Sequence, residues 1–199
     1  MNSKKLAKIK EICEQNDMAN ADAIAAIKEV LEIDNYPNVS KLSNGEAFTF
    51  KGIKFVKIGE EQGGYLCVAA EVLFDSIFDE NNNNYSKSEI KNKLNQLAKK
   101  LGEENFNDFT MDLTSDDGNT EYGTYTCKIG LLSCDLRRKY WKILPRYERY
   151  TWTCTPWYID EKTKTGNCVR VVYSGGLLYG DYAYYSNGVA PACIFKKSN

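Results

Sequence analysis

The chain has 199 residues, a length that fits one domain of ordinary size or one domain with a small appendage. Hydrophobic residues make up 43% and charged residues 27%, a globular composition that excludes wholesale disorder. The 26 Lys and Arg residues nearly balance 27 Asp and Glu, which argues against a protein that coats nucleic acid with its whole surface. The chain has no histidine, so Ser-His-Asp and Cys-His catalysis, histidine-ligated zinc and histidine proton switches are excluded within it.

The first residues of the chain do not have the pattern expected of a targeting signal. Residues 1–15 are charged and have a helical pattern, without the apolar stretch of a signal peptide. No run approaches the roughly 18 apolar residues that a membrane span needs. We therefore expect a cytoplasmic protein without a membrane partner.

Seven cysteines are spread along the chain, and no two of them form a C-x-x-C pair. Zinc sites are typically built from such closely spaced pairs. We therefore expect free thiols that pack as small hydrophobic side chains in a reducing cytosol, with no metal and no cofactor. A zinc site built from four of the cysteines without paired spacing is the alternative.

Residues 4–33 are expected to form two short helices, with a break at residues 15–19. The second helix has one lysine, Lys28, and no arginine, whereas a DNA-recognition helix needs cations for phosphate contacts. We therefore interpret residues 1–40 as a helical arm that packs on the rest of the chain, on a partner or on a second copy. A homodimer through these helices stays open, and direct binding of nucleic acid is not expected.

Beyond the arm, the pattern changes to the alternation typical of β-strands. Residues 48–50 and 53–58 flank a Lys51-Gly52 turn, which predicts a hairpin, and residues 65–72 form an apolar run that suits a buried strand. The four asparagines at 81–84 predict a surface loop outside the packed core.

The strongest helix signal follows this loop. Residues 86–89 have the form of a capping box, and apolar residues then recur at Ile90, Leu94, Leu97 and Leu101. Further strands are expected at residues 122–132, 150–155, 169–173 and 192–195, with turns at 116–119, 174–176 and 187–188. No alternating βαβα pattern occurs, which disfavours Rossmann and barrel folds. The sequence predicts an α+β domain with antiparallel strands over residues 45–199.

An acidic stretch covers residues 102–121, which include seven acidic residues and neither Lys nor Arg. We predict an acidic surface that consists of Glu103, Glu104, Asp108, Asp112, Asp116 and Asp117. Such a surface imitates a phosphate backbone and would fit the groove of a nucleic-acid-binding protein. A calcium loop is disfavoured because the D-x-D-x-D-G spacing of its ligands is not met.

The near-neutral total charge conceals a split chain. Residues 1–44 have a net charge of -1, residues 45–135 of -7 and residues 136–199 of +7. Residues 136–158 contain six Lys or Arg, one Glu, four Tyr and all three Trp. The alternative to a binding role is that the aromatic residues fill the core while the cations neutralise the acidic half. We expect that core role for Tyr150, Trp152 and Cys154, which share one face of a strand.

Arg, Tyr and Trp carry much of the binding energy in protein interfaces, because they cover large flat surfaces and lose little rotamer entropy. We therefore predict a partner-binding surface with two groups of residues. The first lies beside Pro145 and Pro156 and consists of Arg146, Tyr147, Arg149, Trp157 and Tyr158. The second lies in a turn-rich region like that of a paratope and consists of Tyr179, Asp181, Tyr184 and Asn187. A patch that stacks bases and holds phosphates, as in single-strand binders, is the competing interpretation.

A succession of short motifs runs from residue 45 to the C-terminus. The motifs are G-E-A-F at 45–48, Y-S-K-S-E-I at 85–90, L-N at 94–95, L-L-S at 131–133, W-T-C-T-P at 152–156, V-V-Y-S-G-G at 171–176 and G-V-A-P-A at 188–192. Their order over about three-quarters of the chain resembles an uncharacterised domain family of Firmicute genomes, prophages and phages, whose terminal motif is G-V-R-P-A. The family has arginine where this chain has residues 153–155 and Ala190, so no role of those arginines is carried over.

The resemblance implies a C-type-lectin-like α+β scaffold and a phage-like origin. It implies no particular reaction, because the family has no agreed activity. Together with the charge split, the aromatic patch and the lack of a histidine-based catalytic set, it predicts a non-enzymatic phage or prophage protein that occludes a host protein. A nucleic-acid-binding nuclease is one such target, and the chain would then be an anti-defence inhibitor of the anti-CRISPR type.

Two alternatives remain open. A receptor- or glycan-binding module of a phage particle would use Trp157, Tyr179 and Tyr184 to stack on sugar rings or protein epitopes. A glycan hydrolase would use paired carboxylates, for which Glu60, Glu61, Asp75 and Asp160 are the candidates.

Overall fold

The computed structural model describes residues 7, 11 and 38–197 of the chain. The chain divides into two units, Met1–Pro37 and Asn38–Asn199, and the second is described below. Ala7 and Glu11 are helical. The rest of the predicted arm up to residue 37 lies outside the described residues, so the arm and a dimer through it stay predictions.

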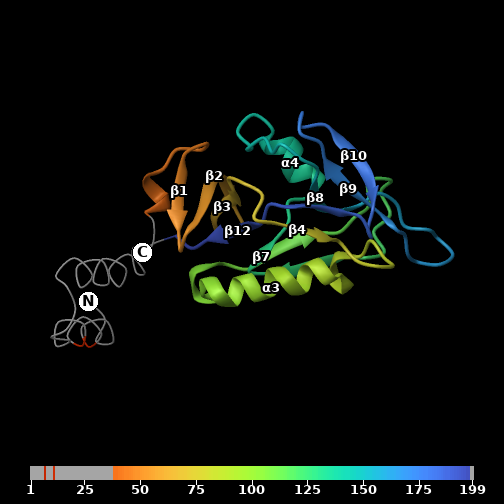
Figure 1. The fold of residues 1–199 in the computed structure, drawn as a ribbon, viewed down its shortest axis with the longest axis horizontal. Helices are drawn as coiled ribbons and strands as arrows, with labels where there is room; N and C mark the ends of the chain where they lie inside the picture. The colour runs from red at the N-terminus through yellow and green to blue at the C-terminus, as the bar shows by residue number, and fades with distance from the viewer. Residues whose placement is uncertain (1–6, 8–10, 12–37, 198–199) are drawn as a thin grey trace. The chain divides into compact units, whose positions relative to one another are not determined.

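Residues 38–197 form a mixed α+β domain, with two α-helices and twelve strands in three mostly antiparallel sheets (Figure 1). The first sheet has the order β1-β2-β3-β12-β7, with strands Ala47–Phe50, Ile53–Glu61, Gly64–Ala69, Ala192–Phe195 and Ile129–Gly130. The second has the order β10-β9-β8-β11-β4, with strands Leu178–Tyr182, Cys168–Val172, Thr151–Pro156, Ser186–Val189 and Phe74–Ile77. A two-stranded sheet pairs β5 (Phe109–Asp112) with β6 (Thr124–Cys127). The predicted α+β class with antiparallel strands is confirmed.

The predicted first hairpin is present, and its turn explains the local sequence. Lys51 and Gly52 join β1 to β2 with φ angles of 46° and 80°. Two successive residues with positive φ form the mirror-image turn whose twist matches that of the flanking strands. The same arrangement recurs at Gln62 and Gly63, which join β2 to β3 with φ angles of 46° and 78°.

The predicted helix is α3 (Glu89–Leu101), and it begins later than the capping box suggested. Ser88 is the N-cap and accepts a hydrogen bond from the Lys91 amide, because Ser86 belongs to a short 3-10 helix, η2 (Tyr85–Lys87). The second helix, α4 (Cys134–Tyr140), packs on β8. In Figure 1, α3 and α4 lie on opposite sides of the domain. Neither helix of the described unit combines the length and the apolar character that a membrane crossing requires.

The prediction that residues 81–84 form a surface loop outside the core is wrong for two of the four asparagines. Asn83 is 0% exposed and Asn84 is 7% exposed. The Asn83 amide nitrogen donates to the carbonyl oxygens of Tyr158, at 2.8 Å, and Cys168, at 2.9 Å. Its amide oxygen accepts from the Tyr122 hydroxyl at 2.7 Å. Burial is tolerated because the side chain is fully hydrogen-bonded by segments distant in sequence.

Two further expectations differ from the structure. Asn187 and Gly188, predicted as a turn, lie inside β11 and pair with Ser76 and Asp75 of β4. Trp152 is buried as expected at 3% exposed, but Tyr150 lies just before β8 begins and is 41% exposed.

The cysteines of the described unit are buried, as the sequence predicted. Cys67, Cys127, Cys134, Cys154, Cys168 and Cys193 are all free and buried. Burial raises the pKa of the Cys127 thiol to about 12, so this sulfur is held as a protonated thiol at neutral pH. Within residues 38–197, no group of three or more cysteine, aspartate or glutamate side chains is placed to hold a metal ion.

Candidate functional site

The β9–β10 hairpin at the edge of the second sheet carries a row of exposed tyrosines. Trp152 and Tyr179 both lie opposite Val171 in the sheet. Tyr150 is two residues from Trp152, and Tyr173 is two residues from Val171. Side chains two residues apart on a strand point to the same side, so the three tyrosines share one face of the sheet. The ring centroids of Tyr150 and Tyr173 are 5.2 Å apart, and those of Tyr173 and Tyr179 are 5.9 Å apart. We call Tyr150, Tyr173 and Tyr179 the tyrosine ladder.

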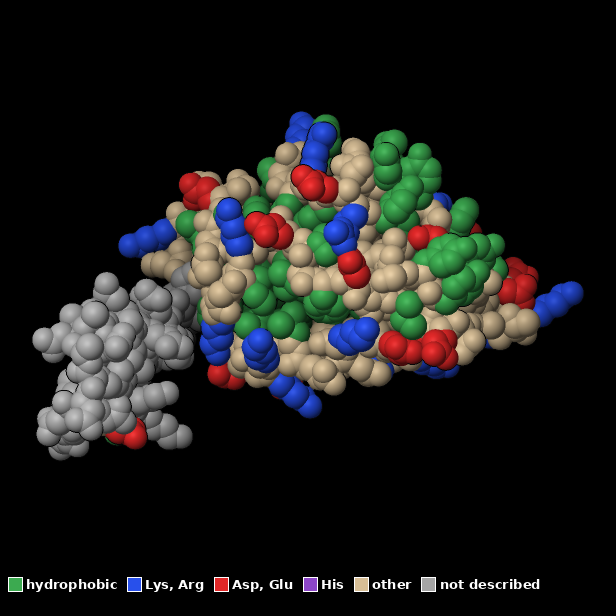
Figure 2. All heavy atoms as spheres, in the orientation of Figure 1, with side chains coloured by type: hydrophobic (Ala, Val, Ile, Leu, Met, Phe, Trp, Pro, Cys, Tyr) green, Lys and Arg blue, Asp and Glu red, His purple; other side chains and the backbone are tan. Residues whose placement is uncertain are grey.

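A second aromatic group follows where β10 ends. Tyr182 and Tyr184 stack with centroids 5.3 Å apart and ring planes at 14°, and Tyr185 meets Tyr184 edge-on at 4.9 Å. We call Tyr182, Tyr184 and Tyr185 the tyrosine triad. The six tyrosines of the ladder and triad are between 41% and 50% exposed. Figure 2 shows hydrophobic side chains gathered at the end of the domain that carries β9 and β10.

The ladder and the triad are separate groups, because side chains alternate along β10 and Tyr182 therefore lies on the opposite face from Tyr179. Polar side chains fix the strand between them. Asp181 accepts a hydrogen bond from the Asn187 amide at 2.8 Å and another from the Tyr182 backbone amide at 3.0 Å. Asn187, predicted as a contact residue, is only 8% exposed. Asp181 and Asn187 therefore tie β10 to β11 and fix the chain between Tyr179 and Tyr182.

Trp157 lies on the other face of the second sheet, although we predicted it in the same surface as Tyr179. Its ring rests on Gly180, where a Cβ atom would come within 1.8 Å of the Trp157 Cε3 atom. The guanidinium carbon of Arg170 is 4.8 Å from the ring centroid, and Arg170 pairs with Gly180 across the sheet. Trp157 is nevertheless 41% exposed, and Tyr158 beside it is 40% exposed. The structure thus divides the predicted surface between two faces.

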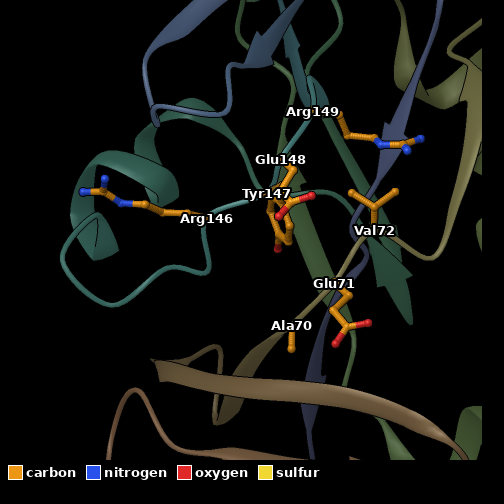
Figure 3. Close-up of a pocket in the computed structure, with 7 residues that line it drawn as sticks. All are labelled: Ala70, Glu71, Val72, Arg146, Tyr147, Glu148 and Arg149. Carbon is orange, nitrogen blue, oxygen red and sulfur yellow. The ribbon is translucent and has the colours of Figure 1, made fainter.

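Three predicted residues line a cavity of about 410 Å³ between residues 70–72 and 146–149 (Figure 3). Tyr147 forms its wall rather than a contact surface, because the ring is 7% exposed and its hydroxyl donates to the Ala69 carbonyl oxygen at 2.7 Å. Arg149 forms an ion pair with Asp75. Figure 3 shows that Arg146 points away from Glu71 and Val72.

Ion pairs between distant segments neutralise much of the charge split. Asp75 pairs with Arg149, Glu121 with Lys164, Glu61 with Lys139 and Glu60 with Lys197. Each pair joins an acid of residues 45–135 to a cation of residues 136–199. These four cations therefore neutralise acidic residues of the same domain, which is the role that our alternative interpretation gave them.

Most carboxylates of the predicted acidic surface already have partners within the domain. Asp116 forms ion pairs with Arg138 and Arg170, and its side chain is 19% exposed. Asp108 pairs with Lys128 at 2.8 Å, while Asp112 and Asp117 accept hydrogen bonds from the hydroxyls of Thr114 and Ser115. Glu103 and Glu104 are exposed on the 3-10 helix η3 (Glu103–Asn105).

The carboxylates proposed for a hydrolase are engaged elsewhere. A hydrogen bond from Lys197 lowers the pKa of Glu60, and backbone amide donors lower that of Asp160. Burial alone would raise the pKa of Glu61, but hydrogen bonds from Lys139 and Tyr140 bring it below its ordinary value. A general acid at neutral pH requires a raised carboxyl pKa. These three groups are therefore poorly suited to that role.

Sequence reasoning missed Tyr173 as a ladder residue. It lies at the end of an apolar strand run, directly before the Ser174-Gly175-Gly176 turn, and its amide donates to the Leu177 carbonyl oxygen at 2.8 Å. A large aromatic residue beside a glycine turn was the available signal, because a hairpin tip cannot bury it.

No family model, curated protein or solved structure matches this chain.

Proposed function

We propose that the chain is a non-enzymatic binding protein that covers a surface of a partner protein through the tyrosine ladder and triad. The observation that carries this proposal is a pair of tyrosine clusters of three residues each, in which every tyrosine is more than 40% exposed. Tyrosine combines a large contact area with few rotatable bonds and a polar tip, and it is enriched in protein interfaces for these reasons.

The local architecture supports a preformed contact surface. Four of the six tyrosines lie on or directly beside paired strands, and Tyr184 and Tyr185 lie in the tight turn after β10. Ring contacts within each group restrict the side chains before a partner arrives. Less conformational entropy is then lost on binding, which favours tight occlusion.

The proposed origin rests on the sequence resemblance, and the proposed class of partner rests on the charge split, the aromatic residues and the lack of a histidine-based catalytic set. We propose a cytoplasmic protein of phage or prophage origin, with a host defence nuclease as its target and a C-type-lectin-like arrangement of residues 45–199 as its scaffold. The mixed α+β domain with antiparallel strands supports the scaffold, and an experimentally determined structure would test it.

The function is tested by mixing the full-length chain with a panel of purified host nucleases and CRISPR effector complexes. Size-exclusion chromatography with light scattering reports complex formation, and DNA cleavage reports inhibition. We expect one member of the panel to form a stable complex and to lose its cleavage activity.

Matched variants identify the contact surface. The double variant Y179S/Y184S should weaken binding at least tenfold, whereas E103S/E104S should bind as the wild type does. The reverse pattern would assign the contact to the acidic surface. Binding to a glycan panel or to intact cells, with no complex among the nucleases, would favour a receptor-binding module instead.

A further inference from the structure

A groove lies on the α4 side of the second sheet, between the residues that follow α4 and the β9–β10 turn. Its volume is about 290 Å³. The side chains that matter for its chemistry are three arginines and three large apolar residues: Arg137, Arg138, Arg146, Trp141, Leu144 and Leu177. No carboxylate is among the described residues that line it.

The chain has five arginines, and the structure divides them into two kinds. Arg138, Arg149 and Arg170 each form ion pairs with one or two carboxylates. Within residues 38–197, the guanidinium groups of Arg137 and Arg146 have neither an ion pair nor a hydrogen bond. Both of these unpaired arginines line the groove.

Arg137 is the more informative of the two because it is partly buried. It lies on α4 three residues after the buried Cys134 and four before Trp141, so the three side chains share one side of the helix. Burial lowers the pKa of its guanidinium, and charge interactions with Tyr147 and Cys134 oppose this shift. A half-buried cation without an anion is costly, and a bound anion would offset that cost.

Arg146 lines the groove from the segment that follows α4. In Figure 3 its side chain extends toward the coiled ribbon of α4 and away from the cavity beside Glu71. Two arginines without a carboxylate partner thus line one groove. A carboxylate is a suitable ligand for them, because the planar fork of arginine can donate two parallel hydrogen bonds.

Two apolar side chains that line the groove are highly exposed to solvent. Trp141 is 66% exposed and Leu177 is 61% exposed, the two highest values among the large hydrophobic side chains of the described unit. An exposed tryptophan beside an arginine is the composition of an interface hot spot. Polyphosphate binding instead requires a row of cations along a backbone, and this groove offers two unpaired ones.

We propose that this groove binds a peptide segment of a partner protein in which an acidic residue neighbours an apolar one. The carboxylate pairs with Arg137 and Arg146, and the apolar side chain packs between Trp141 and Leu177. The proposal rests on the proposed function in that the occupant belongs to a protein partner. It adds a second contact, since the groove and the tyrosine ladder lie on opposite faces of the second sheet.

The test uses the full-length chain and a capped hexapeptide of alternating glutamate and leucine. Matched probes replace glutamate by glutamine or leucine by serine, and a short oligothymidylate represents nucleic acid. The readout is the indole N–H resonance of Trp141, which a W141F variant assigns among the three tryptophan signals. We expect the glutamate–leucine peptide to shift this signal saturably and both matched peptides to bind at least tenfold more weakly.

Variants test the two arginines. R137Q and R146Q should each weaken peptide binding about tenfold, R137K should weaken it less, and K162Q on a remote loop should leave it unchanged. The two-dimensional spectrum of each variant shows whether it is folded, and R146Q tests the groove even if R137Q fails to fold. No shift of Trp141, an equal shift with the glutamine peptide, or a shift with oligothymidylate alone would overturn the proposal.

Failure of the groove proposal and failure of the proposed function give different experimental results. Peptide binding that persists in Y179S/Y184S, with no nuclease bound, would leave the groove in place and remove the proposed function. A nuclease complex that depends on the tyrosines, without any peptide binding, would do the opposite.

Discussion

At the scale of single residues, the same residue type has different roles at adjacent positions. Arg137 and Arg138 are neighbours on α4, yet Arg138 pairs with Asp116 and Asp135 while Arg137 faces the groove. Asn81 and Asn83 likewise differ, because only Asn83 is completely buried. Sequence reasoning could not separate these pairs, since Asp116 and the partners of Asn83 come from distant segments.

Asn83 carries the clearest prediction at this scale. Replacing it by alanine removes a hydrogen bond from the carbonyl oxygens of Tyr158 and Cys168 and from the hydroxyl of Tyr122. The Cys168 oxygen keeps the Trp157 amide as a donor at 2.9 Å, so the main loss falls on the Tyr158 carbonyl and the Tyr122 hydroxyl. We expect N83A to lower the free energy of unfolding by about 3 kcal/mol, because each buried polar group without a partner costs about 1–3 kcal/mol. Urea denaturation measures this loss, and N92A on the exposed side of α3 is the control. An N83A variant as stable as N92A would contradict the assigned role.

At the scale of elements, local patterns were sufficient where the structure is local. The Lys51-Gly52 hairpin and α3 depend on neighbouring residues, and both were predicted. Asn187 and Gly188 look like a turn in sequence, but pairing with β4 and β8 places them in a strand. The tyrosine ladder was found only in part, because strand register and not sequence spacing brings Tyr150 to Tyr173 and Tyr173 to Tyr179.

The packing of Trp157 on β10 gives a prediction for this scale. G180A should displace the Trp157 ring, because the new Cβ atom would lie within 1.8 Å of it. We expect a loss of about 1–3 kcal/mol in unfolding free energy, the usual cost of overpacking, together with a shift of the tryptophan fluorescence. G175A is the matched control, since its nearest neighbour is the Tyr173 ring at 3.6 Å. Equal effects of the two variants would show that Trp157 is not held by Gly180.

At the scale of the whole molecule, ion pairs within the domain neutralise much of the charge split of the sequence. Asp116 illustrates this, because its carboxylate joins Arg138 of α4 to Arg170 of β9. Burial would raise the pKa of Asp116, but hydrogen bonds from Arg170 and Arg138 lower it below its ordinary value. Charge counting along the sequence therefore overstated the acidic surface.

This network predicts a pH dependence of stability. Because the pKa of Asp116 is lower in the folded state than in the unfolded state, its stabilisation is complete above the unfolded value of about 3.9. The stabilisation is lost as the pH falls through the folded value. Between pH 5 and pH 2, the unfolding free energy of the wild type should therefore fall more steeply than that of D116N. Parallel curves for the two proteins, measured by denaturant unfolding at each pH, would contradict this account.

The central claim is that the tyrosine ladder and triad form the surface by which this protein covers its partner. Hydroxyl-radical footprinting of the free chain and of its complex, read by mass spectrometry, tests it most directly. The account predicts strong protection of Tyr173, Tyr179 and Tyr184 in the complex and unchanged oxidation of Tyr125, which lies outside both groups. Unchanged oxidation of all six ladder and triad tyrosines in a complex that forms would contradict it.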